Sequence, residues 1–165
     1  MNLLLVVLCF IIIQMIQSYR ILKEKSMLSN IKRMMSNNSI DTNKLIILCQ
    51  DYINNSNNHN VDLCLKDFND NTEYVSSAVG LYKGKAMISN MMKGYFDKFP
   101  NVHWDVKNYM KSLQYQNAIE FNFIRTGCQN NDGQNIIAEG NECIIFDDNT
   151  QISKVIVETT ITKVI

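Results

Sequence analysis

Three ionisable side chains in the second half of the 165-residue chain, His103, Arg125 and Glu142, have the chemistry to act on a ligand. A carboxyl group surrounded by apolar side chains has a raised pKa and can exchange a proton with a bound molecule. If Glu142 shares a strand face with Gly140 and Ile144, it enters the interior as a candidate general base. On the other face it would be an exposed glutamate paired with a lysine, and the sequence leaves both placements open.

His103 is the second candidate catalytic residue, as a proton donor. It precedes Trp104 directly, and adjacent residues of a strand point to opposite faces. If Trp104 belongs to the core, His103 therefore lies outside it. A catalytic role and an exposed position are both open for this histidine.

Arg125 is a candidate ligand-binding residue. In its alternating strand pattern it falls on the same face as Phe121 and Phe123. Its planar guanidinium group can hold a ligand carboxylate through two parallel hydrogen bonds. A structural ion pair with Glu142 or Asp105 would account for the position equally well.

Aromatic and methionine side chains supply the wall that such polar groups would need. At these spacings they are typical of a packed core, but in a hollow domain one wall can serve as core and as ligand site. A wider set that includes Met91, Tyr95 and Phe99 could line or plug the interior. The residues that we expect to bind the ligand are Tyr74, Tyr82, Met92, Phe96, Trp104, Phe121, Phe123 and Arg125.

Composition and motifs argue against several classes of function. Basic and acidic residues are equal in number at 16 each, so no net charge favours binding to nucleic acid. The sequence has no nucleotide-binding glycine loop, nucleophile elbow, HExxH motif or cysteine pair with metal-ligand spacing. We therefore expect no cofactor, no metal and no nucleic-acid partner.

Residues 72–100 predict the unit that positions much of this wall. The stretch begins with strand-forming residues, and Gly80 and Gly84 allow the backbone to turn. From Lys85 onward apolar residues recur at intervals of three or four, which predicts an amphipathic helix. The only proline of the chain, Pro100, ends that helix.

The rest of the domain is predicted to contain two earlier helices and four later strands. Asp41 or Thr42 can cap a first helix and Asn60 a second, with a turn at 67–72. After Pro100 the apolar period changes from that of a helix to that of a strand, and short turns between strands require antiparallel neighbours. We expect an α+β domain whose helices cover one face of a curved antiparallel sheet. The expected strands are 104–110, 118–127, 136–146 and 152–164.

Short motifs in both halves of the domain carry a family resemblance. They are Tyr82-Lys83-Gly84-Lys85, Phe99-Pro100 and Trp104 in the first half, and Arg125-Thr126-Gly127, Gly140-Asn141-Glu142 and Phe146-Asp147-Asp148 in the second. In this order the segment resembles a SnoaL-like domain of the nuclear-transport-factor-2-like superfamily. The resemblance implies a cone-shaped, cystatin-like α+β roll, in which the curved antiparallel sheet wraps around three helices and opens at one end to an apolar cavity.

The resemblance also implies classes of function. Superfamily members that act as isomerases, cyclases or epoxide hydrolases place an aspartate inside the cone, whereas residues 75–78 here are Val-Ser-Ser-Ala. Catalytic roles therefore do not transfer directly, and we expect first a domain that binds a small apolar or aromatic molecule with no assured catalysis. The alternatives are a cofactor-independent isomerase or cyclase-type enzyme that uses Glu142 or His103, and a dimerising scaffold, because many relatives form dimers through the sheet.

The N-terminal segment differs in character from the rest. Residues 3–13 form an unbroken apolar run that predicts a hydrophobic helix, shorter than the about 20 apolar residues that span a bilayer. The run matches the core of a secretory signal cleaved after Ser18, or a retained membrane anchor, because positive charges follow it. Residues 19–40 would then be a linker or a basic amphipathic helix, and 41–165 the domain. We expect a secreted or secretory-pathway protein, or one anchored to a membrane through residues 1–18.

Overall fold

The computed structural model describes residues 17, 20–27, 40–129 and 133–164. The apolar run at 3–13, the cleavage position after Ser18 and most of the 19–40 segment lie outside the described residues, so the predictions for them stay predictions. Residues 20–27 are helical. Within the described part of the chain, no helix is both long enough and apolar enough to cross a membrane.

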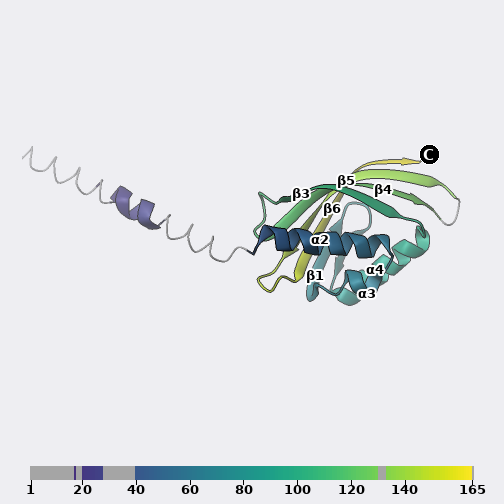
Figure 1. The fold of residues 1–165 in the computed structure, drawn as a ribbon, viewed down its shortest axis with the longest axis horizontal. Coiled ribbons are helices and arrows are strands. Elements are labelled where there is room, and N and C mark those ends of the chain that lie inside the picture. The colour runs from purple at the N-terminus through teal and green to yellow at the C-terminus, as the bar shows by residue number, and fades with distance from the viewer. Residues whose placement is uncertain (1–16, 18–19, 28–39, 130–132, 165) are drawn as a thin grey trace, which may run out of the picture. The chain divides into compact units, whose positions relative to one another are not determined.

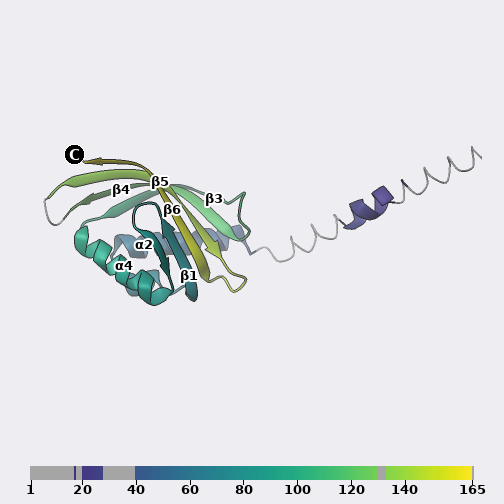
Figure 2. The same ribbon diagram turned by 180° about the vertical axis from the view of Figure 1, so that it is seen from behind.

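From Ile40 onward the chain forms a compact α+β unit of its own. Strands β3, β4 and β5 arch over α2 (Figure 1), and the view from behind shows α4 and β1 beneath the same arch (Figure 2). In chain order the elements are α2 (Thr42–Asn57), α3 (Val61–Cys64), β1 (Phe68–Ser76), β2 (Gly80–Lys83), α4 (Lys85–Lys98), β3 (His103–Lys111), β4 (Ala118–Cys128), β5 (Asn135–Phe146) and β6 (Ile152–Val164).

Each helix begins where the sequence predicts a cap or a turn. The side chain of Asp41 accepts a hydrogen bond from the backbone N–H of Asn43 at the start of α2. Asn60 caps α3 in the same way, through the N–H of Leu63. Helix α4 begins after Gly84, whose φ of 83° is a conformation that favours glycine.

The six described strands form one sheet in the order β2-β1-β6-β5-β4-β3. All pairs are antiparallel except β1 with β6, which run parallel. The predicted α+β class, with a curved sheet around three helices, is confirmed, but the sheet is mixed rather than wholly antiparallel. The reason is that β6 returns beside β1 after a long excursion through α4 and four strands, β2 to β5, so no short turn constrains the direction of this pair.

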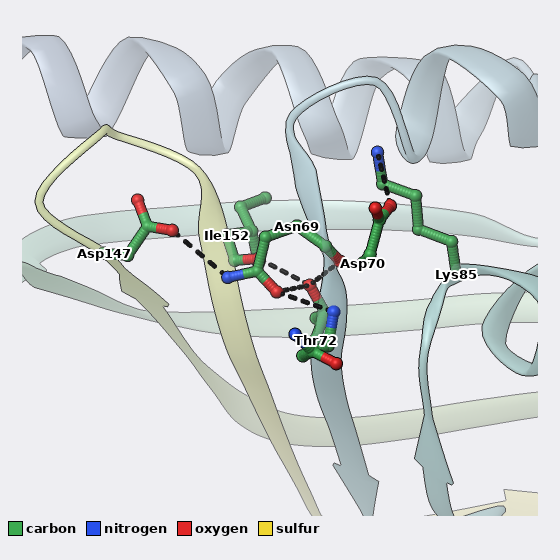
Figure 3. Close-up of polar contacts among 7 residues, drawn as sticks. Asn69, Asp70, Thr72, Lys85, Asp147 and Ile152 are labelled. Atoms are coloured by element: carbon green, nitrogen blue, oxygen red, sulfur yellow. Dashed lines mark hydrogen bonds and ion pairs between the residues drawn. The ribbon is translucent and has the colours of Figure 1, made fainter.

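The start of β1 also differs from the prediction of a turn at 67–72. A polar cluster ties this segment to the turn between β5 and β6 (Figure 3). Asn69 Nδ2 donates to Asp147 Oδ2 at 3.1 Å, and Thr72 Oγ1 donates to the carbonyl oxygen of Ile152 at 2.6 Å. Thr72 is fully buried. These bonds fix the register of β1 two residues before Tyr74, which reaches the interior.

Candidate functional site

A cavity lies between the helices and the concave face of the sheet. Its wall is mostly apolar and aromatic, with side chains from α2, β1, α4 and all of β3 to β6. Counted as the space open to the centre of a water molecule, its interior volume is about 40 Å³. One water needs roughly 10–15 Å³ on that measure. The cavity therefore accommodates a few waters or a small organic molecule, and the flexible side chains of Met91 and Met92 in its wall can adapt to a somewhat larger one.

Glu142 enters this cavity from the middle of β5. The alternation of the strand places Ala138, Gly140, Glu142 and Ile144 on one face, so the first of the two placements that the sequence left open is the one observed. The side chain is 4% exposed, and its Oε1 atom is buried without a hydrogen-bond partner. Burial raises the pKa of Glu142 from its usual 4.5 to about 8. The carboxyl group is therefore mostly protonated at neutral pH.

Two tyrosine hydroxyl groups lie near the carboxyl group. Burial is the main cause that raises the pKa of Tyr52 and of Tyr74, and the negative charge of ionised Glu142 raises both further. A hydrogen bond between the two phenols acts in the opposite direction on the pKa of Tyr74. Both phenols therefore stay protonated, and because one of them donates to the other, one O–H group of the pair is left as a donor to a ligand in the cavity.

Arg125 enters the cavity from β4, where it lies opposite Trp104 of β3 and Ala138 of β5. It is 9% exposed, and its Nε atom is buried without a partner. Among the described residues, no carboxylate lies within 4.0 Å of the guanidinium group, and Asp105 pairs with Lys107 instead. The structural ion pair that the sequence left open is therefore not formed.

Tyr95 completes the wall around Arg125. The Cζ atom of Arg125 lies 5.5 Å from the centre of the Tyr95 ring, which is within the range of a cation–π contact. The Tyr95 hydroxyl is buried, and the donor near it is the Arg125 guanidinium group, so its own proton has no acceptor. Burial raises the pKa of Tyr95, and the nearby Arg125 charge partly opposes that rise. Glu142, Arg125 and Tyr95 thus present unpaired polar atoms to the same small space.

Six of the predicted site residues come together in this wall. They are Tyr74, Met92, Phe96, Trp104, Arg125 and Glu142.

The other four predicted residues lie elsewhere. His103 is exposed and does not line the cavity, because Trp104, its neighbour on β3, takes the inward position. Phe121 and Phe123 are buried core residues whose rings pack against other parts of the sheet, Phe121 against Tyr109 at 5.0 Å between centroids.

Tyr82 also lies outside the cavity wall. It belongs to β2, the short outer strand, and is half-buried against the core. Two polar residues of α2 line the cavity that the sequence did not single out for binding, Tyr52 and Ser56. Tyr52 falls on the apolar face of its helix, where an aromatic residue indicates core packing, so only the hydroxyl group hinted at another role.

Among the described residues no group of three or more histidine, cysteine, aspartate or glutamate side chains is placed to hold a metal ion. In the same part of the chain, Cys49, Cys64, Cys128 and Cys143 are free thiols.

Comparison with known proteins identifies the fold. No protein-family model matches the chain, and no curated protein sequence matches it. Among solved structures, the epoxide hydrolase/cyclase-like enzyme SalBIII, with a role in pyran ring formation in the polyether salinomycin, superposes with a TM-score of 0.67 at 12% identity, over 76% of this chain and 98% of that one. An NTF2-like protein of unknown function from Exiguobacterium gives 0.62 at 12% identity, over 68% and 98%.

A third structure is a hexachlorocyclohexane dehydrochlorinase, LinA-type3 from Novosphingobium barchaimii, with a TM-score of 0.61 at 12% identity over 72% of this chain and 85% of that one. At such low identity the likeness concerns the fold. The described residues from Ile40 onward have the nuclear-transport-factor-2-like fold, which confirms at this level the resemblance drawn from the motifs.

Proposed function

We propose that this chain, with its nuclear-transport-factor-2-like fold, is a cofactor-independent enzyme that binds a small molecule in the cavity and moves a proton on it through Glu142. One observation carries the proposal: a carboxyl group, 4% exposed, turns an unpartnered oxygen toward an apolar cavity. A domain that only binds or only dimerises has no need of an unpaired buried acid, which costs stability. This observation favours the enzyme alternative over the binding domain that we expected first.

The protonation state of Glu142 suits this role. With a pKa of about 8, both the acid and its conjugate base are present near neutral pH, which is the condition for efficient general acid–base catalysis. The named activities of two proteins with the same fold, a hydrolase/cyclase-like enzyme and a dehydrochlorinase, support the same broad class of small-molecule chemistry.

The proposed step is a proton transfer at carbon. Ionised Glu142 takes a proton from a carbon next to a carbonyl group, and the electron pair of the C–H bond moves toward the carbonyl oxygen to give an enolate. The O–H group that the hydrogen-bonded pair Tyr52 and Tyr74 leaves free is the donor best placed to stabilise that oxygen. The proton on Glu142 exchanges with solvent water, protonated Glu142 then delivers a proton to the same carbon or to a conjugated one, and the enzyme ends in its starting state.

Exchange of carbon-bound hydrogen with solvent tests this proposal. The full chain is incubated in D₂O with small ketones such as 2-pentanone and 4-oxopentanoate, and deuterium next to the carbonyl is followed by proton NMR. We expect exchange above the buffer rate, lost in Glu142→Gln and kept in Glu139→Gln. Glu139 is the matched control because it lies three residues earlier on β5 with its side chain exposed.

Two outcomes would overturn the proton-transfer step: no exchange on any compound of the panel, or equal exchange by Glu142→Gln and the unmodified chain. Fluorescence of Trp104, the only tryptophan and a part of the cavity wall, reports binding separately. Binding without exchange would support the domain that binds without turnover.

Two further proposals are each tested by a separate measurement. The first is secretion or membrane anchoring through residues 1–18, and the second is a homodimer. The mass of the chain recovered from expressing cells distinguishes cleavage after Ser18 from retention of the segment. Light scattering at increasing concentration tests the dimer, and a single monomer mass throughout would rule it out under those conditions.

A further inference from the structure

We propose that Arg125 and Tyr95 form a subsite for a carboxylate, so that the molecule bound in the cavity is a small carboxylic acid. The inference rests on the proposed function only in placing the ligand in the same cavity. It concerns two side chains that the proton transfer does not use, and it names the chemical class of the ligand.

The first argument is the unbalanced charge of Arg125. A guanidinium group stays protonated in proteins, so the charge cannot be relieved by titration. The residue is 9% exposed, its Nε atom has no partner, and no carboxylate of the described residues lies within 4.0 Å. A buried charge without a counter-charge is costly, and an anion in the cavity would offset this cost.

The second argument is the neighbouring hydroxyl group. Tyr95 lies against the guanidinium group, which is the donor near its buried hydroxyl, so the proton of that hydroxyl has no acceptor. Two unpaired donor groups therefore border the same part of the wall, and an acceptor is what both lack. A carboxylate accepts from both, is planar like the guanidinium group, and is small enough for an interior of about 40 Å³.

The third argument is the spacing from Glu142 along the sheet. Arg125 pairs with Ala138 on β5, and Glu142 lies four residues further along that strand. Four residues of a strand span roughly 13 Å between Cα atoms, a gap that the long arginine side chain can shorten. The carboxylate of the ligand would therefore be held several bonds away from the carbon on which Glu142 acts.

A comparison of acids with their amides tests the subsite. Fluorescence of Trp104, the cross-strand neighbour of Arg125, is titrated with hexanoate and with hexanamide at about pH 6, where Glu142 is protonated. We expect the acid to bind roughly tenfold or more tightly than the amide, since charge-assisted hydrogen bonds distinguish the two. Arg125→Met should remove the preference, and Tyr95→Phe should reduce it a few-fold.

Lys107→Met is the matched control, because it removes one exposed positive charge from the same sheet outside the cavity. It should leave the preference unchanged. Acid and amide binding equally, or neither changing the fluorescence up to about 50 mM, would overturn the subsite. If Arg125→Met does not fold, the Tyr95→Phe variant decides the matter, and an unchanged preference in it counts against the proposal.

The same titration on Glu142→Gln separates the two proposals. If the acid is still preferred while carbon-bound hydrogen no longer exchanges, the subsite and the proton transfer both stand. If exchange fails in the unmodified chain but the acid is preferred, only the proton transfer falls. If 2-pentanone exchanges its carbon-bound hydrogen but hexanoate binds no more tightly than hexanamide, only the subsite is overturned.

Discussion

Glu142 faces the cavity from a position of β5 directly paired with Val157 of β6, so an aliphatic side chain, not a cation, lies beside the carboxyl group. The other ionisable groups whose pKa values respond to its charge are protonated thiols and phenols, Cys49, Tyr52 and Tyr74 among them. No cation among the described residues stabilises the ionised form, which is why burial governs the pKa of Glu142.

Stability should therefore fall as pH rises. The folded chain holds the Glu142 proton up to about pH 8, whereas the unfolded chain releases it near 4.5. Because the folded state binds more protons between these values, the free energy of unfolding decreases across this window and levels off above it. The full loss is up to about 5 kcal/mol for a shift of this size.

Urea unfolding at intervals from about pH 5 to pH 8.5 measures this slope. The window lies above the range of exposed carboxylates such as Glu73, whose pKa is lowered by Lys154 and Lys83. The free energy of unfolding of Glu142→Gln should be nearly independent of pH in this window, and that of Glu139→Gln should keep the slope of the unmodified chain. A slope that survives in Glu142→Gln would show that another group is responsible.

The rate of carbon-bound hydrogen exchange should have the opposite dependence on pH. Only ionised Glu142 can take a proton, and its fraction rises with pH until it saturates above about pH 8. We expect kcat/KM for exchange to rise about tenfold per pH unit well below that value and to reach a plateau above it. Initial rates of deuterium incorporation over this range check the profile, and a rate that falls with rising pH would assign Glu142 the role of acid.

Local sequence rules predicted the elements well, because their causes are local. Asp41 and Asn60 cap their helices as expected, and the shift in apolar period after Pro100 marked the four later strands. The prediction of a wholly antiparallel sheet was wrong for β1 and β6, which run parallel. Strands so far apart in sequence have no short turn between them that fixes their relative direction. The short strand β2, with only four residues, left no periodic signal.

The site was predicted only in part, because its geometry also depends on pairing between strands that are distant in sequence. Alternation along β5 restricted Glu142 to two faces, but only the pairing with neighbouring strands shows which face is the interior. The same alternation correctly separated Trp104 from His103. Tyr52 could not be assigned, because its hydroxyl group reaches the cavity from a helix position where the ring alone explains the residue.

Gly140 should resist any side chain. It lies at the irregularity in the β5–β6 pairing, where Glu139 pairs with Ile161 and Gly140 with Thr159. A Cβ atom there would overlap the carbonyl oxygen of Glu158 and lie 2.6 Å from Cζ of Phe123. We expect Gly140→Ala to lower the free energy of unfolding by about 2 kcal/mol or more, as overpacking does.

Gly94→Ala provides the comparison for this change. Gly94 is inside α4, and an added Cβ atom would meet nothing within 4 Å. Alanine there should stabilise the fold by about 0.5–1 kcal/mol, because it is the better helix former. Urea unfolding of both variants checks the pair, and similar effects at the two positions would contradict the steric account of Gly140.

Thr72 should be the member of the polar cluster at the start of β1 that matters most for stability. Its hydroxyl group donates to the carbonyl oxygen of Ile152, and the side chain is fully buried (Figure 3). Thr72→Val keeps the shape but removes the donor, so we expect a loss of about 1–3 kcal/mol in the free energy of unfolding. Thr126→Val, at an exposed position of β4, should change it by less than about 0.5 kcal/mol. Urea unfolding monitored by Trp104 fluorescence measures both, and equal stability of the two variants would show that the bonds of the cluster do not hold β1 in place.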